Sequence, residues 1–331
     1  MSFAPFRGSK VSSSAWHPGR RALQGGSQPG SPLPLLDFAT AWRAYLDAAP
    51  RLPALPAPVT PRRVAGIAEI AGAFDLVVLD AWGVLNLGDS VIPAAPAAVA
   101  ELRRRGKRIV VLSNDGSSDK AMAVAKHRRR GFDFAGEEII AGIDLLPDAL
   151  SGLPAPERLG LIADDPLPFA ALTDRMRRLA DRAADYDEVE GFVFLSSDGW
   201  SEARQAKLRA SMARRRRPLI VGNPDIVSPA PDAIAVEPGH YAHRLAAEFA
   251  LAPIFLGKPY AAIYRKLAER HPDIAPDRVL CVGDTPHTDI LGGRSAGYRA
   301  MLVEDGFCRG RDALALCRES GIWPDFIAPR L

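Results

Sequence analysis

The sequence has few cysteines, no long apolar run and only a small net charge, and each of these features excludes a class of protein. Three cysteines occur in 331 residues, and an odd number without a CxxC pair argues against a framework of disulfide bonds. No apolar run approaches the roughly 20 residues that a helix needs to span a bilayer, and no secretory signal segment is recognisable. The formal net charge of +3 is too small to indicate nucleic-acid binding. We therefore expect a reduced, cytoplasmic enzyme that binds neither nucleic acid nor membranes.

Acidic residues are missing from the start of the chain. None precedes Asp37, and the same stretch is rich in Pro, Gly, Ser and Arg. Its apolar content is too low for a core, so we expect residues 1–62 to be a disordered or poorly ordered tail and linker with one short helix at about 37–47. A transit peptide is also acid-poor and Arg-rich, but it is amphipathic, whereas Pro and Gly interrupt this stretch.

From residue 63 onward, short apolar runs alternate with helical patterns. The run 76–79 is continuously apolar and contains two valines, which is typical of a strand buried on both faces of a parallel sheet. The alternation predicts an α/β, doubly wound fold. Within it, residues 154–225 read as an inserted second α/β unit, so the first and last sections share one sheet. Further strands are expected at 108–114, 159–163, 191–195, 219–221, 253–256, 278–284 and 298–303, and helices at 96–106, 118–130, 137–150, 167–184, 201–213, 240–250 and 260–269.

Polar side chains follow four of the expected strands. They are Asp80, the pair Ser113-Asn114, Lys258, and Asp284 with Asp289. A lone Asp after a strand more often caps a turn, but the carboxyl ends of parallel strands meet at one edge, where open α/β sheets bind ligands. Mg²⁺ takes oxygen ligands and usually one or two carboxylates plus phosphate, a lysine binds phosphate, and an Asp can act as a nucleophile. The pattern predicts a site for phosphate and Mg²⁺.

These motifs and their order resemble those of the haloacid dehalogenase (HAD) superfamily of hydrolases. Asp80-Ala81-Trp82-Gly83-Val84-Leu85 is similar to the first motif of that family, and Ser113-Asn114 to the second. Gly257-Lys258-Pro259 is similar to the third, and Gly283-Asp284 through Asp289 to the fourth. The large insertion and the string Asn223-Pro224-Asp225 are similar to class IIA, which includes NagD and the p-nitrophenyl and pyridoxal phosphatases. The resemblance implies a Rossmann-like HAD core at 63–152 and 241–331, and an α/β cap domain at 153–240.

The resemblance also implies roles for residues at matching positions. Asp80 would be the nucleophile that forms an aspartyl-phosphate, and the substrate would be a small phosphorylated metabolite such as a sugar phosphate. The cap would permit a homodimer. By role, the implied residues are catalytic Asp80, Ser113 and Lys258; substrate-binding Asn114 and Asn223; and, for Mg²⁺, Asp80, the backbone carbonyl of Trp82, Asp284 and Asp289.

Trp82 departs from the family pattern. Phosphatases of the superfamily carry a second Asp two residues after the nucleophile, where it protonates the leaving oxygen and later activates water. Loss of such general acid–base catalysis typically costs about 10²–10⁴-fold in rate. The chain resembles a proteobacterial subgroup of class IIA that has tryptophan here. His287, or one of His240, Tyr241 and His243, is a candidate replacement acid, although a surface-loop position is the favoured interpretation for His287.

Two further functions stay open at this point. Trp82 is compatible with a catalytically impaired phosphoester-binding protein. It is also compatible with a metal-free HAD hydrolase that cleaves another bond, because dehalogenases of the family carry an aromatic residue at the same offset. The Gly283-Asp284 to Asp289 motif argues against the metal-free alternative.

Overall fold

The structure, a computed structural model, describes residues 35–230 and 233–331. The disorder expected for the beginning of the tail therefore lies outside the described residues. No helix among the described residues is long and apolar enough to cross a membrane.

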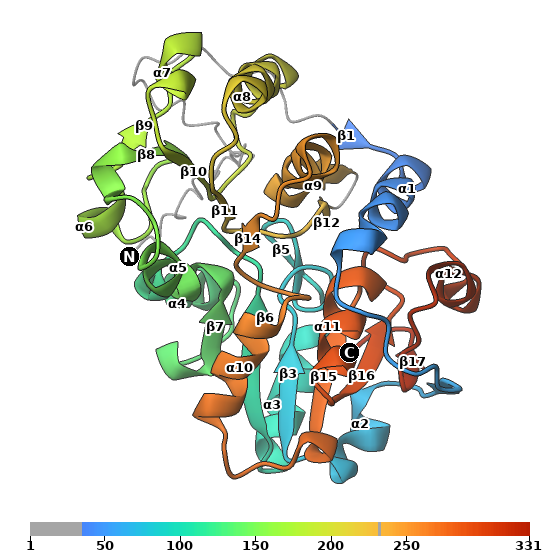
Figure 1. The fold of residues 1–331 in the computed structure, drawn as a ribbon. Helices are drawn as coiled ribbons and strands as arrows, with labels where there is room; N and C mark the ends of the chain where they lie inside the picture. The colour runs from blue at the N-terminus through green and yellow to red at the C-terminus, as the bar shows by residue number, and fades with distance from the viewer. Residues whose placement is uncertain (1–34, 231–232) are drawn as a thin grey trace, which may run out of the picture. The chain divides into compact units, whose positions relative to one another are not determined.

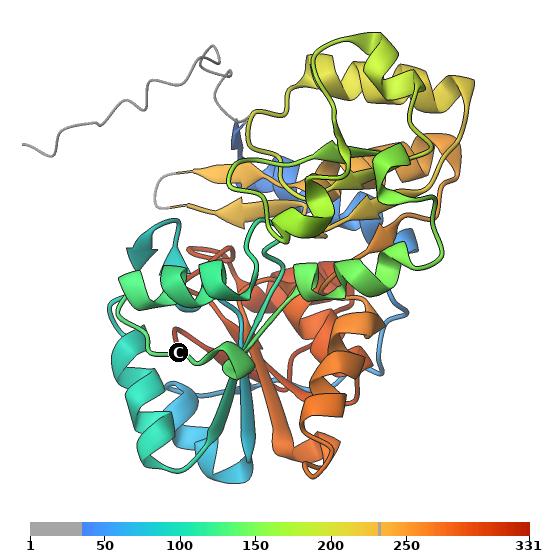
Figure 2. The same ribbon diagram turned by 90° about the vertical axis from the view of Figure 1, so that its left-hand side faces the viewer.

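The larger sheet has seven strands, all parallel (Figures 1 and 2). Its central strand β3 (Leu76–Leu79) is buried at every position. Because side chains alternate across a strand, Val77 and Leu79 join the cluster that includes α2 and α3, whereas Leu76 and Val78 join the cluster that includes α5 and α10. Helices on both faces confirm the doubly wound α/β prediction. The order is β2 (Arg62–Arg63), β17 (Phe326–Ala328), β16 (Arg299–Val303), β15 (Val279–Gly283), β3, β6 (Arg108–Ser113) and β7 (Ile139–Ala141).

The helices expected at 96–106, 118–130 and 260–269 are found close to these positions, whereas the helix Ala313–Ser320 was not predicted. A helix was expected at 137–150, but its first part is the edge strand β7, because Ile139, Ile140 and Ala141 pair with β6. Neighbouring Ile residues suit a strand better than a helix, and only a short α5 remains at the end of the segment. The helices are α2 (Ile67–Ile70), α3 (Ala95–Arg104), α4 (Lys120–Arg129), α5 (Leu146–Leu150), α10 (Ala261–Arg270), α11 (Leu291–Ser295) and α12 (Ala313–Ser320).

A second parallel sheet of five strands belongs to the inserted section. Two predictions fail here. The helix expected at 167–184 is divided by a strand at Arg177–Arg178 that pairs with β8, and the strand Ile254–Phe255 pairs with β11 rather than joining the larger sheet. The inserted section therefore extends beyond residue 240. Its strands are, in order, β14 (Ile254–Phe255), β11 (Leu219–Val221), β10 (Gly191–Phe194), β8 (Leu159–Ile162) and β9 (Arg177–Arg178), and its helices are α6 (Ala170–Thr173), α7 (Ala183–Asp187), α8 (Glu202–Arg214) and α9 (Pro238–Phe249).

The segment just before the larger sheet is well packed. Helix α1 (Phe38–Ala48) is capped by Asp37, whose side chain accepts a hydrogen bond from the Thr40 amide at 2.7 Å, so the predicted short helix is confirmed. Trp42 and Tyr45 are buried against residues of the larger sheet. Residues 35–48 are therefore not the poorly ordered tail that their composition predicts, because their few apolar residues share one helix face.

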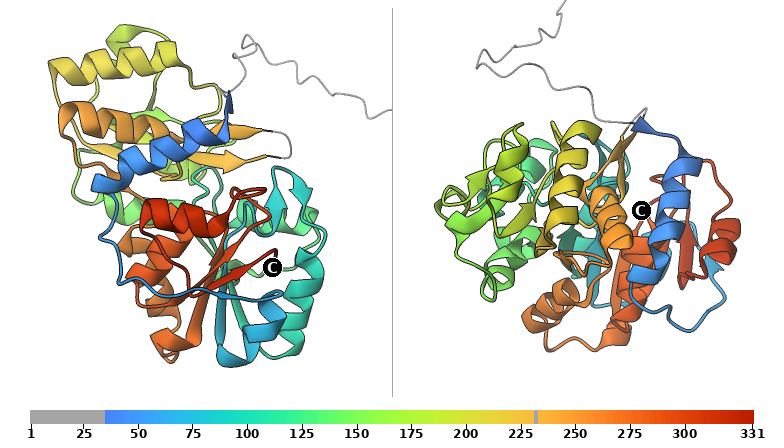
Figure 3. Two further views of the ribbon diagram at one scale, coloured as in Figure 1. Left: turned by 90° about the vertical axis from the view of Figure 1, so that its right-hand side faces the viewer. Right: turned by 45° about the horizontal axis from the view of Figure 1, so that its top comes forward.

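Two antiparallel pairings complete the fold. Strand β1 (Leu35–Leu36) adds to the hairpin of β12 (Val227–Pro229) and β13 (Ile234–Val236), and Figure 3 shows α1 running beside this hairpin. A small hairpin of β4 (Asn86–Leu87) and β5 (Ser90–Val91) follows β3.

Candidate active site

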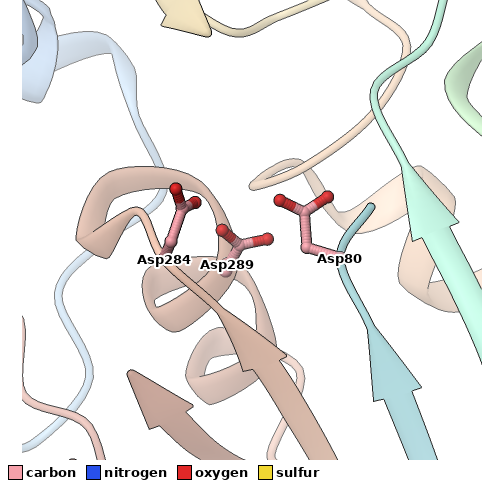
Figure 4. A group of neighbouring side chains, drawn as sticks. All are labelled: Asp80, Asp284 and Asp289. Atoms are coloured by element: carbon pink, nitrogen blue, oxygen red, sulfur yellow. The ribbon is translucent and has the colours of Figure 1, made fainter. Parts of the chain in front are cut away.

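Three carboxylates meet at the carboxyl edge of the larger sheet. Leu79 of β3 pairs with Val282 of the neighbouring β15, so Asp80 and Asp284 leave the sheet side by side. Asp289 comes from the turn Pro286–Ile290 that follows β15. One oxygen from each carboxylate lies within 4.8 Å of the other two, and Figure 4 shows the three side chains grouped above the strands. The structure thus brings together the three carboxylates that the motifs selected.

Lys258 joins two of these carboxylates. Its Nζ donates to Asp80 Oδ1 at 2.6 Å and to Asp289 Oδ1 at 2.7 Å, and the side chain is buried. Burial opposes the charge on Lys258, but Asp289 and Asp80 together raise its pKa above the usual value. The lysine therefore stays charged.

The cluster carries more negative than positive charge. Burial and the nearby Asp289 carboxylate raise the pKa of Asp80 well above its usual value and that of Asp284 to about 7. When ionised, three carboxylates and one ammonium group leave an excess of negative charge that a divalent cation would offset. Carboxylate oxygens are also the ligands that Mg²⁺ prefers. The residues present therefore fit Mg²⁺.

Glycines allow the chain to close around Asp284. A Cβ on Gly83, whose φ is +84°, would lie 1.8 Å from Asp284 Oδ2, and one on Gly306 would lie 2.1 Å from the same oxygen. Only glycine permits both this approach and this backbone conformation. The amide of Phe307 then donates to Asp284 Oδ2 at 2.6 Å. The glycine of the first motif thus holds the loop after Asp80 against the second carboxylate.

Asn114 links three parts of the chain. Its Nδ2 donates to Asp225 Oδ1 at 2.8 Å and to the Lys258 carbonyl at 3.0 Å, and its Oδ1 accepts from the Lys258 amide at 2.7 Å. The side-chain amide of Asn114 therefore positions the backbone at Lys258. The other predicted substrate-binding residue, Asn223, donates to Glu237 Oε2 at 3.0 Å, while Ser113 Oγ accepts from the Asp115 amide at 3.1 Å.

A cavity of about 350 Å³ opens beside Asp80. Trp82 is half-buried in its wall. Core residues form one side of the cavity and residues of the inserted section form the other. The lining includes Asp80, Trp82, Ser113, Asn114, Asp115, Lys126, Arg130, Asp164, Ser196, Asp198, Asn223, Asp225, Ser228 and Glu237.

None of the candidate replacement acids lines this cavity. His287 is buried, with its ring centroid 4.9 Å from those of both Trp42 and Tyr45, and burial lowers its pKa to about 3. The prediction of a surface loop for His287 is wrong, because α1 covers it. His240 and His243 lie on α9 and line a separate groove beside α1, and Tyr241 is buried among the aromatic residues of the inserted section.

Several polar residues of the cavity were not selected from the sequence. Asp164 follows β8, Asp198 follows β10, and Asp225 follows β11, so they end strands of the second sheet as Asp80 ends a strand of the first. These three could have been predicted from the sequence, because polar residues that follow parallel strands mark the edge where such sheets bind ligands. Glu237 follows an antiparallel strand, and no sequence signal marks it.

Comparisons with known proteins identify the family of the chain. A family model described as haloacid dehalogenase-like hydrolase matches residues 77–171, and a HAD-hydrolase-like model matches residues 255–331. Human chronophin is 29% identical over 76% of this chain and 88% of its own length. Glycerol-3-phosphate phosphatase of Gallus gallus is 28% identical over the same shares. The structure of a possible sugar phosphatase of the HAD superfamily from Cytophaga hutchinsonii superposes with a TM-score of 0.68 at 22% identity, over 82% of this chain and 98% of that one.

Proposed function

Because the chain belongs to the haloacid dehalogenase-like hydrolases and is a hydrolase of the phosphatase type, we propose that it is a Mg²⁺-dependent phosphohydrolase of small phosphorylated metabolites. The reaction would pass through an aspartyl-phosphate on Asp80. One observation carries the proposal: the carboxylates of Asp80, Asp284 and Asp289 converge within 4.8 Å, and Lys258 joins two of them. A site that only bound a phosphate would need no such excess of carboxylates.

Asp80, Asp284, Asp289 and the backbone carbonyl of Trp82 would hold the cation. When bound, Mg²⁺ would offset the negative charge of the phosphoryl group and of the attacking carboxylate.

Asp80 is arranged to attack with one oxygen. Its Oδ1 accepts from Lys258 Nζ and, at 2.7 Å, from the Ala81 amide, while Oδ2 accepts no hydrogen bond from the described residues. Attack by Oδ2 would form the bond to phosphorus as the ester oxygen leaves with the electron pair of the broken bond. Ser113 Oγ and Lys258 Nζ would hold the phosphoryl oxygens. Water would then hydrolyse the aspartyl-phosphate, which releases phosphate and restores the carboxylate.

The test is phosphate release from p-nitrophenyl phosphate. Asp80→Asn is nearly isosteric, so we expect the variant to fold normally and to lose turnover, and we expect EDTA to stop the wild-type reaction. Circular dichroism and the thermal midpoint would serve as folding controls. An unchanged rate in Asp80→Asn would exclude the aspartyl-phosphate mechanism.

Trp82 supports a second candidate function, a phosphoester-binding protein with little or no turnover. If this second function is correct, a phosphate ester should bind in the presence of Mg²⁺ without release of phosphate. A metal-free reaction at another bond would instead show full activity in EDTA, and the carboxylate cluster argues against it.

A further inference from the structure

Three carboxylates of the inserted section line the cavity without a cationic partner among the described residues. These cap-side carboxylates are Asp164, Asp198 and Glu237. No Lys, Arg or His in the described part of the chain forms a salt bridge with any of them. By contrast, Asp115 in the same cavity pairs with Lys126 Nζ at 2.9 Å.

Neutral groups hold two of the three in place. Glu237 accepts from Ser228 Oγ at 2.5 Å and from Asn223 Nδ2 at 3.0 Å. Asp164 accepts from Ser196 Oγ. These hydrogen bonds fix the two carboxylates but leave their charge uncompensated.

The carboxylates also make each other harder to ionise. Burial and the nearby Asp198 raise the pKa of Asp164 to about 6, even though the Ser196 hydrogen bond lowers it. Burial, with contributions from Asp225 and Asp198, raises the pKa of Glu237 to about 8. A cation placed between them would relieve both effects.

The catalytic side of the cavity fixes what must lie next to these carboxylates. If Mg²⁺ offsets the excess charge of the Asp80 cluster, the charge of a bound phosphoryl dianion still faces the cap-side carboxylates. The repulsion between like charges is several times stronger in a partly buried site than in water. An anionic leaving group would increase the repulsion, a neutral polyol could only donate hydrogen bonds, and an ammonium group would reverse the sign of the interaction.

We propose that the substrate of this site is a phosphate ester whose leaving group carries an ammonium group, bound by the cap-side carboxylates. This inference rests on the proposed function, since it assigns the leaving-group side of the same cavity. Phosphates of amino alcohols and of amino sugars share the required chemistry.

The first test compares three small esters that differ in the charge of the leaving group: phosphoethanolamine, glycerol 3-phosphate and phosphoglycolate. With wild-type protein and Mg²⁺, we expect kcat/KM to fall in that order, with about tenfold between the first two, which corresponds to one favourable charge pair. A higher kcat/KM for glycerol 3-phosphate or phosphoglycolate than for phosphoethanolamine would overturn the proposal.

Asp164→Asn tests the carboxylates directly. We expect the ratio of kcat/KM for phosphoethanolamine to that for phosphoglycolate to fall by about tenfold or more. The matched control is Asp165→Asn, the same change at the next residue, whose exposed side chain pairs with Arg178 and does not line the cavity. The control should keep the wild-type ratio. Equal ratios in the two variants would contradict the assignment.

A binding measurement separates this inference from the proposed function. Calorimetry with Asp80→Asn and Mg²⁺ reports the preference among the three esters without turnover. Failure of wild type to hydrolyse any ester, p-nitrophenyl phosphate included, would refute the proposed function. Tighter binding of phosphoethanolamine than of the other two would still support the ammonium site, and equal or weaker binding would overturn it.

Discussion

Trp82 is the residue with the largest consequence for the chemistry. It stands two positions after Asp80 and lines the same cavity, and none of the candidate replacement acids named from the sequence lies there. If Asp80 transfers phosphate without a proton donor, leaving groups that are weak bases should react well and alkoxides poorly. Hydrolysis of the aspartyl-phosphate should also be slow, so p-nitrophenyl phosphate should give an early burst of product followed by a slow steady rate.

We predict that Trp82→Asp raises the turnover of alkyl phosphates by up to about 10²–10⁴-fold, the range that general acid–base catalysis supplies. Trp82→Asn is the matched control, because it opens the same space without a titratable group. The measurement is kcat for glycerol 3-phosphate and p-nitrophenyl phosphate with all three proteins. An equal gain in turnover for both variants would mean that the space left by the smaller side chain, rather than proton transfer, causes the increase. A wild-type rate on the alkyl ester of roughly 1–10³ s⁻¹ would show that another group supplies the proton.

Strand order explains only part of the predicted site. Asp80 and Asp284 follow neighbouring parallel strands, whose carboxyl ends meet at one edge. The strand before Lys258 pairs with β11 in the second sheet instead, so only the motif resemblance identifies Lys258. Glu237 and the environment of His287 depend on packing between distant segments. His287 is covered by Trp42 and Tyr45, and nothing near residue 287 in the sequence indicates that helix.

At the scale of elements, strong apolar periodicity predicted most helices and the central strands, whereas very short strands escaped prediction. Strands β7 and β9 contain three and two residues. Strand β9 consists of two Arg residues, so its pairing with β8 rather than its composition sets the extended conformation. Strand β14 was predicted, but not its place in the second sheet. The packing of residues 35–48 was missed for a different reason, because a low overall apolar content hides the fact that the predicted helix concentrates its apolar side chains on one face.

We predict that Trp42→Ala lowers the free energy of unfolding by about 3–5 kcal/mol, the usual cost of removing a large buried aromatic side chain. Trp42 is 5% exposed, and its Nε1 donates to Glu319 Oε2 at 2.9 Å. Arg43→Ala, the same truncation on the exposed face of α1, should change stability by no more than about 0.5 kcal/mol. Urea denaturation of both variants is the measurement. Equal stabilities would mean that α1 does not dock on the larger sheet in solution.

At the scale of the whole molecule, metal binding and folding should be coupled through Asp284. Without a cation, burial and Asp289 raise the pKa of Asp284 to about 7, so ionising this carboxylate at neutral pH destabilises the folded protein. Asp284→Asn removes the charge but keeps the shape, and its amide oxygen can still accept from the Phe307 amide. We therefore predict that, in EDTA, the variant has a higher thermal midpoint than wild type.

Saturating Mg²⁺ should reverse that order. A ligand at a hundred times its Kd stabilises the folded state by about 2.7 kcal/mol, which corresponds to a rise in Tm of roughly 5 °C for a protein of this size. Wild type should gain this stability, and Asp284→Asn should gain much less, because it has lost a ligand. Asp277→Asn, an exposed position just before β15, carries the same substitution at the opposite end of the strand and should follow wild type in both conditions. Differential scanning calorimetry in EDTA and over a Mg²⁺ series measures all three proteins. Parallel responses of wild type and Asp284→Asn would place the cation elsewhere. If wild type has the lower Tm in EDTA and the higher Tm in Mg²⁺, Asp284 is a Mg²⁺ ligand, and this conclusion needs no measurement of activity. The reason is that the carboxylate that lowers stability in the empty cluster must then be the one that raises stability when the cation binds.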